Sequence, residues 1–134
     1  MQSRQKTGGL TLVVALMLGG CAGGSPPVNS GLSEGRLRPC PDSPNCVSSQ
    51  AEVVSQQVEA LRYTGDTRLA QSRLLAVLNG MERVRIQQAD PTYIHAEFSS
   101  ALWGFVDDVE FQFESSGVIP VSYTHLTLPT SDLV

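Results

Sequence analysis

The stretch DTRLAQSRLLAVLNGMERVRIQQADPTYIHAEF, residues 66–98, decides the fold class. Its first half predicts a helix that begins after Asp66, a residue type suited to an N-cap, and ends at Asn79-Gly80. Apolar residues recur in this half with the period of one helical face: Ala70, Leu74, Val77, Leu78 and Met81. The pattern therefore predicts an amphipathic helix.

The second half of the stretch predicts two antiparallel strands. Val84 and Ile86 alternate with polar residues, and Asp90-Pro91 is typical of a turn. The strand after the turn places apolar and small residues on one face, at Thr92, Ile94, Ala96 and Phe98.

Strands are also predicted on both sides of this stretch. Leu61-Arg62-Tyr63 is a candidate short strand, and residues 105–114 predict a longer one that ends at the turn Ser115-Ser116-Gly117. One amphipathic helix packed on a small antiparallel sheet is an α+β fold. We expect this domain to span residues 37–121, which is long enough for one modest hydrophobic core.

The first 20 residues resemble a secretory signal. Arg4 and Lys6 precede an apolar run over residues 10–18, which is too short to span a bilayer as a helix. The run ends in Leu18-Gly19-Gly20-Cys21, which resembles a lipobox. We expect residues 1–20 to be a lipoprotein signal peptide, and the Cys21 thiol to be the site of lipidation.

Lipidation would make the acyl chains, palmitate among them, the anchor in the membrane, because two or more chains anchor a protein firmly. Ala22 follows the cysteine, and by analogy with lipoprotein sorting this favours the outer membrane, with the domain facing the periplasm. Residues 21–36 are rich in Gly, Ser, Pro and Asn and are expected to form a lipidated flexible tether.

The charge of the chain argues against nucleic acid as a partner. Arg4 and Lys6 belong to the signal, so the remainder carries seven basic side chains against 13 acidic ones. An acidic chain without a basic run lacks the electrostatic footprint of a nucleic-acid-binding protein. The sequence names no protein or small-molecule partner and no cofactor.

Two cysteines remain once Cys21 is assigned to lipid. Cys40 and Cys46 flank Pro-Asp-Ser-Pro-Asn, whose residues favour a tight loop. In an oxidising compartment such a pair predicts a disulfide that closes an N-terminal loop. A redox pair and a free or metal-bound pair are the alternatives, although redox pairs usually have the C-x-x-C spacing.

Two motifs carry a family resemblance. CPDSPNCVSS, residues 40–49, and FVDDVEF, residues 105–111, resemble signatures of the domain of unknown function 1499 family of bacterial envelope lipoproteins. The resemblance covers about residues 37–121. It implies no established activity.

Three acidic residues that lie close together, Asp107, Asp108 and Glu110, form the candidate functional cluster of the chain. On a strand, Asp108 and Glu110 share one face and Asp107 lies on the other. The cluster could pair internally, form a solvated face, or bind a metal and act in acid–base catalysis. The family resemblance favours pairing, because it implies arginines on the following strand.

Two single residues have weaker functional interpretations. His95 could join a site formed by the acidic cluster, but a lone histidine on a strand is more often structural. Trp103 is expected to pack in the core or at its rim, and contact with a ligand is the alternative. The sequence contains no G-x-S-x-G, H-E-x-x-H, P-loop or dinucleotide-binding glycine motif.

The sequence leaves the family pattern at Ser122. Residues 122–130 lack the arginines that the resemblance implies, and they resemble a peptide that recurs when sequencing-adapter DNA is translated. We therefore treat residues 122–134 as an atypical tail that a sequence artefact would explain, and we discount roles for His125. Without the natural last strand, the domain is expected to be truncated, with unpartnered carboxylates and an open sheet edge.

The leading hypothesis is a lipid-anchored envelope protein whose small domain is a non-catalytic binding or structural module. One alternative is a metal-assisted hydrolase that uses Asp107, Asp108 and Glu110. The other is a carrier of a small apolar ligand, which predicts an apolar pocket beneath the helix.

Overall fold

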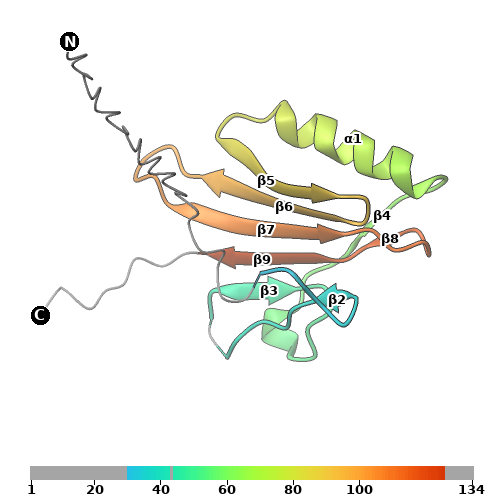
Figure 1. The fold of residues 1–134 in the computed structure, drawn as a ribbon. Coiled ribbons are helices and arrows are strands. Elements are labelled where there is room, and N and C mark those ends of the chain that lie inside the picture. Colours follow the sequence, from blue (N-terminus) through green and yellow to red (C-terminus); the bar gives the residue numbers. More distant parts are fainter. Residues whose placement is uncertain (1–29, 43, 126–134) are drawn as a thin grey trace, which may run out of the picture.

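A computed structural model describes residues 30–42 and 44–125. The signal segment, Cys21 and residues 126–134 lie outside these described residues. Figure 1 shows a twisted sheet with one helix on one face and the N-terminal segment on the other. In chain order the elements are β1 Leu32–Ser33, β2 Arg36–Leu37, β3 Cys46–Ser48, the 3-10 helix η1 Val54–Gln56, β4 Leu61–Arg62, α1 Thr67–Asn79, β5 Val84–Asp90, β6 Tyr93–Ser99, β7 Val106–Gln112, β8 Val118–Ile119 and β9 Val121–His125.

The main sheet has five strands in the order β3-β9-β7-β6-β5, and every neighbouring pair is antiparallel. Two small two-stranded sheets, β1-β2 and β4-β8, accompany it. The α+β prediction is confirmed, and so is the disulfide, which joins Cys40 to Cys46 with 5.6 Å between their Cα atoms. Among the described residues, no helix is long and apolar enough to cross a membrane.

The helix begins and ends where the sequence predicts. The Asp66 side chain accepts a hydrogen bond from the Leu69 backbone N–H at 3.0 Å, and the Gly80 N–H closes the last turn. The predicted apolar face is partly wrong, because Val77 is 60% exposed and Met81 46% exposed. Val77 lies at the margin of the face, Met81 follows the helix end, and Leu75 packs on the core instead.

The hydrophobic core lies between α1 and one face of the sheet. Ile94 and Ala96 on β6 are fully buried, as the alternation predicts. Their neighbours in the core are Ala70, Leu78, Val109, Phe111, Phe113 and Ile119. Each large side chain buried here contributes about 1.5–3 kcal/mol relative to its exposed state.

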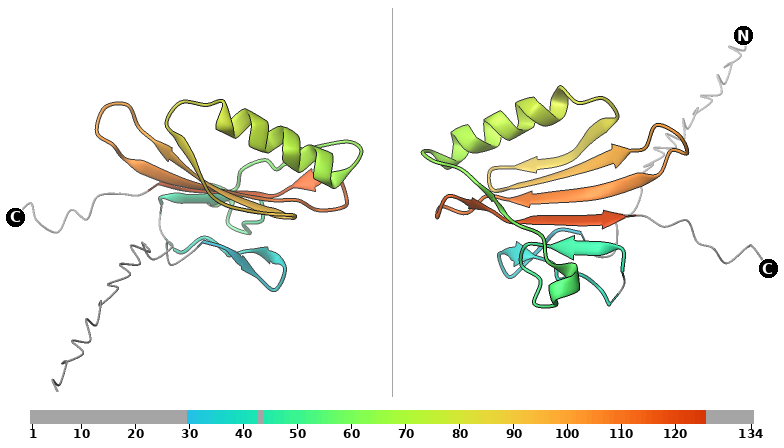
Figure 2. Two further views of the ribbon diagram at one scale, coloured as in Figure 1. Left: turned by 45° about the horizontal axis from the view of Figure 1, so that its top comes forward. Right: turned by 180° about the vertical axis from the view of Figure 1, so that it is seen from behind.

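The opposite face of the sheet is covered by the N-terminal segment, as the two views of Figure 2 show. The Gly31 N–H donates a hydrogen bond to Glu110, and the Gln112 side-chain amide donates one to the Gly35 carbonyl. Residues 30–36 were expected to belong to the flexible tether; instead, β1 and β2 form a hairpin on the sheet. Long-range hydrogen bonds fix this segment, and composition alone does not reveal them.

The start of the expected tail is part of the main sheet. Val121–His125 forms β9 and lies between β3 and β7, so the described sheet does not end at β7 as an open edge. Strand pairing uses backbone groups, and the β-branched and aromatic residues of this segment suit a strand whatever the origin of its sequence.

Candidate functional site

The acidic residues of β7 divide between the two faces of the sheet, as the strand pattern predicts. Asp108 and Glu110 lie on the face covered by the N-terminal segment, and each is 3% exposed. The Asp107 side chain lies on the other face, where it contacts β9 residues. The structure therefore does not bring the three carboxylates together at one point.

Asp108 pairs with His95 on the neighbouring strand. The His95 Nε2 atom lies 2.6 Å from Asp108 Oδ1, and both side chains are buried. The hydrogen bond to Asp108 raises the pKa of His95 above its ordinary value, although desolvation by burial opposes this rise. The rise favours the protonated imidazolium form of His95, in which the pair is a buried ion pair. The second oxygen, Oδ2 of Asp108, is buried without a hydrogen-bond partner among the described residues.

Glu110 lies beside this pair and has two donors of its own. The Tyr93 hydroxyl donates to Glu110 Oε1 at 2.5 Å, and the Gly31 N–H donates to the same oxygen. Burial raises the pKa of Glu110, and the two hydrogen bonds oppose that rise. Burial and the nearby carboxylate also raise the pKa of the Tyr93 hydroxyl, which keeps it a donor at all physiological pH values.

We name the group Tyr93, His95, Asp108 and Glu110 the buried polar layer. The register places His95 opposite Glu110 and Glu97 opposite Asp108, so side chains from β6 and β7 interleave on one face. This layer lies between the sheet and the N-terminal hairpin, because Gly31 contacts Glu110 directly. It is the largest concentration of buried titratable groups among the described residues.

Asp107 forms a separate, half-exposed cluster with β9. Its carboxylate accepts a hydrogen bond from the Tyr123 hydroxyl at 2.7 Å and lies 2.6 Å from His125 Nδ1. Burial and the bond to Asp107 raise the pKa of Tyr123 to about 12. Tyr123 and His125 belong to the atypical tail, so we assign this cluster no function.

No arginine pairs with either cluster among the described residues, in keeping with the departure of residues 122–130 from the family pattern. The expectation that the carboxylates would then be unpartnered is wrong, because His95, Tyr93 and β9 residues bond them instead. Among the described residues, the ion pair of an arginine is that of Arg83 with Glu82, at 3.7 Å; both side chains are largely exposed, and the pair belongs to neither cluster. The segment expected to supply arginines is the one that departs from the family pattern. Sequence reasoning missed Tyr93 as a partner, although its alternation with the core residue Ile94 already placed it on the same face as His95.

Metal binding by the acidic cluster was one of the alternatives. Within residues 30–42 and 44–125, no group of three or more His, Cys, Asp or Glu side chains has an arrangement that could hold a metal ion. The carboxylate oxygens that bond His95, Tyr93 and Gly31 are already engaged by the protein. The arrangement is therefore suited to holding strands and hairpin together.

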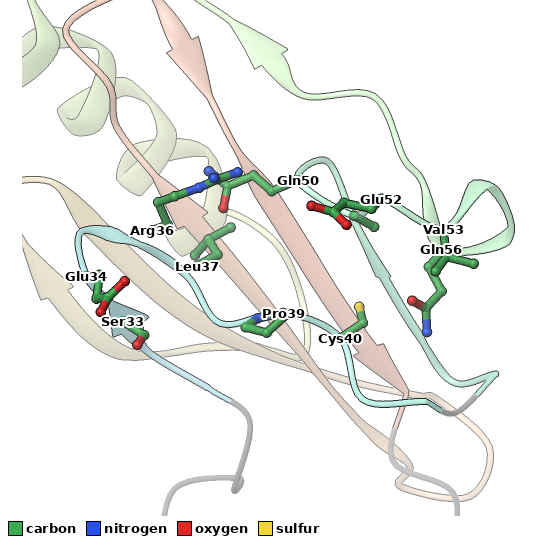
Figure 3. Close-up of a pocket in the computed structure, with 11 residues that line it drawn as sticks. Ser33, Glu34, Arg36, Leu37, Pro39, Cys40, Gln50, Glu52, Val53 and Gln56 are labelled. Atoms are coloured by element: carbon green, nitrogen blue, oxygen red, sulfur yellow. The ribbon is translucent and has the colours of Figure 1, made fainter.

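Two pockets of the described residues have linings that include no member of the buried polar layer. Figure 3 shows one of about 410 Å³ between the β1–β2 hairpin and the loop that follows β3, with Glu34, Arg36 and Glu52 at its wall. A groove of about 940 Å³ lies beside the N-terminal half of α1, and its lining mixes polar residues such as Asp66 and Arg68 with the apolar side chains of Leu75 and Phe113. Core side chains fill the space directly beneath the helix, where an apolar carrier would need its pocket.

Trp103 does not pack in the core or at its rim, so that prediction is wrong. Its side chain is 79% exposed, and the neighbouring Leu102 is 75% exposed. Both lie in the turn between β6 and β7, which extends past the ends of those strands (Figure 1), and no element of the described residues covers them.

Comparison with known proteins places these features in a family. Residues 36–123 match the family described as a protein of unknown function, DUF1499. The chain belongs to this family. No curated protein and no solved structure matches the chain.

The DUF1499 match separates the features of the chain into two groups. The disulfide and the buried polar layer lie inside the matched range, and so does Trp103. Cys21 precedes the range, and His125 follows it. The family assignment therefore applies to the polar layer and not to the Asp107–His125 contact.

Proposed function

We propose that this DUF1499 protein is a lipid-anchored protein of the cell envelope, held at the outer membrane and facing the periplasm. The lipobox Leu18-Gly19-Gly20-Cys21, after a short apolar run, supports this. The Cys40–Cys46 disulfide supports it independently, because disulfides form and persist in oxidising compartments such as the periplasm.

The domain acts, in this proposal, as a non-catalytic binding or structural module. The observation that carries this is the internal pairing of the buried polar layer. A catalytic acid or base must reach a substrate, whereas Asp108 and Glu110 are 3% exposed and bonded to His95, Tyr93 and Gly31. Glu110 joins the sheet to the N-terminal segment through Gly31, and Asp108 joins β7 to β6 through His95.

Metabolic labelling tests the anchor. Cells that express the full chain are grown with radiolabelled palmitate, and the protein is followed through membrane fractionation. We expect label in the wild type, in the outer-membrane fraction, and no label in Cys21→Ser. A wild-type protein that stays unlabelled would contradict the proposed anchor.

Thermal melting tests the non-catalytic role. The purified protein is melted with EDTA and then with excess Mg²⁺, Ca²⁺ or Zn²⁺, and we expect no change in Tm. A bound metal whose free concentration is 100 times its dissociation constant would stabilise the folded state by about 2.7 kcal/mol, which would raise Tm by several degrees for a domain of this size. Such a shift, abolished by Asp108→Asn, would favour the metal-dependent alternative.

A further inference from the structure

The turn between β6 and β7 presents apolar side chains to solvent in a fixed arrangement. The Ser100 N–H donates to the Phe105 carbonyl at 2.8 Å, and the Phe105 N–H donates to the Ser100 hydroxyl at 3.0 Å. These two bonds close the turn below Leu102 and Trp103, which are 75% and 79% exposed. Exposed large apolar residues held side by side in this way are typical of an interaction surface.

The chemistry of the turn is that of a membrane interface. Residues 100–105 are Ser-Ala-Leu-Trp-Gly-Phe and carry no charge. Tryptophan concentrates at the boundary between headgroups and hydrocarbon, where its ring is buried and its indole N–H stays hydrated. An uncharged turn can enter that boundary without the cost of desolvating an ionised side chain.

The place of the turn in the fold leaves it free to reach a flat surface. Figures 1 and 2 show the β6–β7 connection extending past the end of the sheet, beyond the arrowhead of β6 and clear of α1. Among the described residues, no other element packs over Leu102 or Trp103, as their exposure shows.

The tether length brings the turn within reach of the bilayer. Eight residues separate Cys21 from Ser30, and the tether that the sequence predicts there would span about 14–17 Å on average. A domain of this size has a radius of gyration of about 13 Å, so its surface would touch the membrane often. The described chain enters the sheet at Gly31, which bonds Glu110. Glu110 lies four residues, or about 14 Å, along β7 from Val106, where the strand leaves the β6–β7 turn, so the turn is close to the point where the tether joins the domain.

We propose that the β6–β7 turn is a membrane-docking element that inserts Leu102 and Trp103 into the lipid interface. This inference rests on the proposed lipid anchor, since the anchor holds the domain close to the bilayer. The turn adds a second, weaker attachment, and it sets which side of the domain faces the lipid. Because the chain is acidic and the turn uncharged, docking needs no anionic lipid.

Trp103 is the only tryptophan of the chain, so its fluorescence reports on the turn without labelling. The full-length acylated protein is reconstituted into phosphatidylcholine vesicles with and without brominated acyl chains. We expect the Trp103 emission of the vesicle-bound protein to lie at shorter wavelengths than that of the same protein in buffer after its acyl chains have been removed enzymatically. We also expect strong quenching by the brominated lipid and protection from acrylamide.

Two variants keep the reporter and separate the turn from general hydrophobicity. Leu102→Ser removes one inserted side chain, and Val54→Ser removes an apolar side chain that is 81% exposed in η1, away from the turn. In the unacylated Cys21→Ser protein, Leu102→Ser should weaken vesicle partitioning about tenfold or more, because a buried leucine contributes about 1.5–3 kcal/mol. Val54→Ser should leave partitioning unchanged.

Two results would overturn the docking proposal. The first is Trp103 open to acrylamide and unquenched by brominated lipid. The second is Trp103 protected from acrylamide without quenching by brominated lipid, which would indicate a protein covering the turn. Failure of the anchor is a separate result, because the Cys21→Ser protein tests the turn without palmitate. Residues 1–20 are the same in every Cys21→Ser variant, so their contribution to partitioning does not affect the comparison between variants.

Discussion

The buried pair His95–Asp108 makes a strong prediction about stability. Replacing His95 with phenylalanine would leave the Asp108 carboxylate 3% exposed and without its hydrogen-bonded partner. Removing one member of a buried ion pair typically costs about 3–5 kcal/mol. For a domain of this length we expect Tm to fall by at least about 12 °C, at about 4 °C or more for each kcal/mol.

Replacing Asp108, or both members of the pair, should change the free energy of unfolding by different amounts. Asp108→Leu should cost less, about 1–3 kcal/mol, because His95 can lose its proton and remain buried as a neutral ring with one unpaired donor. The double variant His95→Phe/Asp108→Leu should lie close to the wild type, since an apolar pair replaces both charges. The cycle therefore isolates the interaction between the two side chains.

The pair also predicts how stability changes with pH. The pKa of His95 is raised in the folded state, so its contribution is fully present below the unfolded value of about 6.5 and is lost as pH rises through the folded value. The raised pKa of Glu110 acts in the same direction, because the folded state holds that proton more tightly. The wild type should therefore gain stability between pH 8 and pH 5, and His95→Phe should gain less.

Urea unfolding followed by far-ultraviolet circular dichroism measures these values. Trp103 is 79% exposed in the folded state, so its fluorescence would report unfolding poorly. Glu82→Gln is a suitable control, because it removes a surface contact to Arg83 at 3.7 Å and should leave the urea midpoint unchanged. Losses below about 1 kcal/mol for His95→Phe, with an unaltered pH profile, would refute the assignment of a buried ionised pair.

Three further predictions follow from contacts elsewhere in the domain. Tyr93→Phe removes a hydroxyl that donates to a buried carboxylate, and the urea midpoint should show a loss of about 1.5–3 kcal/mol; a loss in the range of a surface substitution would argue against that bond. Replacing Cys40 and Cys46 by serine should cost about 2 kcal/mol through the entropy of the short loop, measured against the wild type with and without reductant. Asp66→Ala should lower stability by about 1 kcal/mol, whereas Asp66→Asn keeps a capping oxygen and should restore most of it.

The parts of the fold predicted correctly from sequence depend on local chemistry. The Asp66 cap, the Gly80 terminus and the Asp90-Pro91 turn each involve residues close together in the chain, and the structure has all three. The disulfide could be predicted because two cysteines flank a short loop. Alternation on β6 also predicted that Ile94 and Ala96 are buried.

The partners of the acidic residues could not be predicted in the same way. A strand pattern assigns Asp108 and Glu110 to a face, but only the register of β6 on β7 brings His95 and Tyr93 beside them. The tether boundary failed for a similar reason. Gly31 bonds a residue 79 positions away, and no local signal in a Gly- and Ser-rich segment indicates such a contact.

The buried polar layer gives the N-terminal hairpin a defined position that its own size could not provide. β1 and β2 have two residues each, and an isolated two-stranded hairpin is at best marginally stable in water. Leu37 is its buried apolar side chain, at 4% exposure. Directional hydrogen bonds from Gly31 to Glu110 and from Gln112 to Gly35 therefore fix the hairpin on the sheet. Losing these hydrogen bonds would free the hairpin and expose carboxylates that the fold otherwise keeps from water. The hairpin and the buried polar layer therefore stabilise each other.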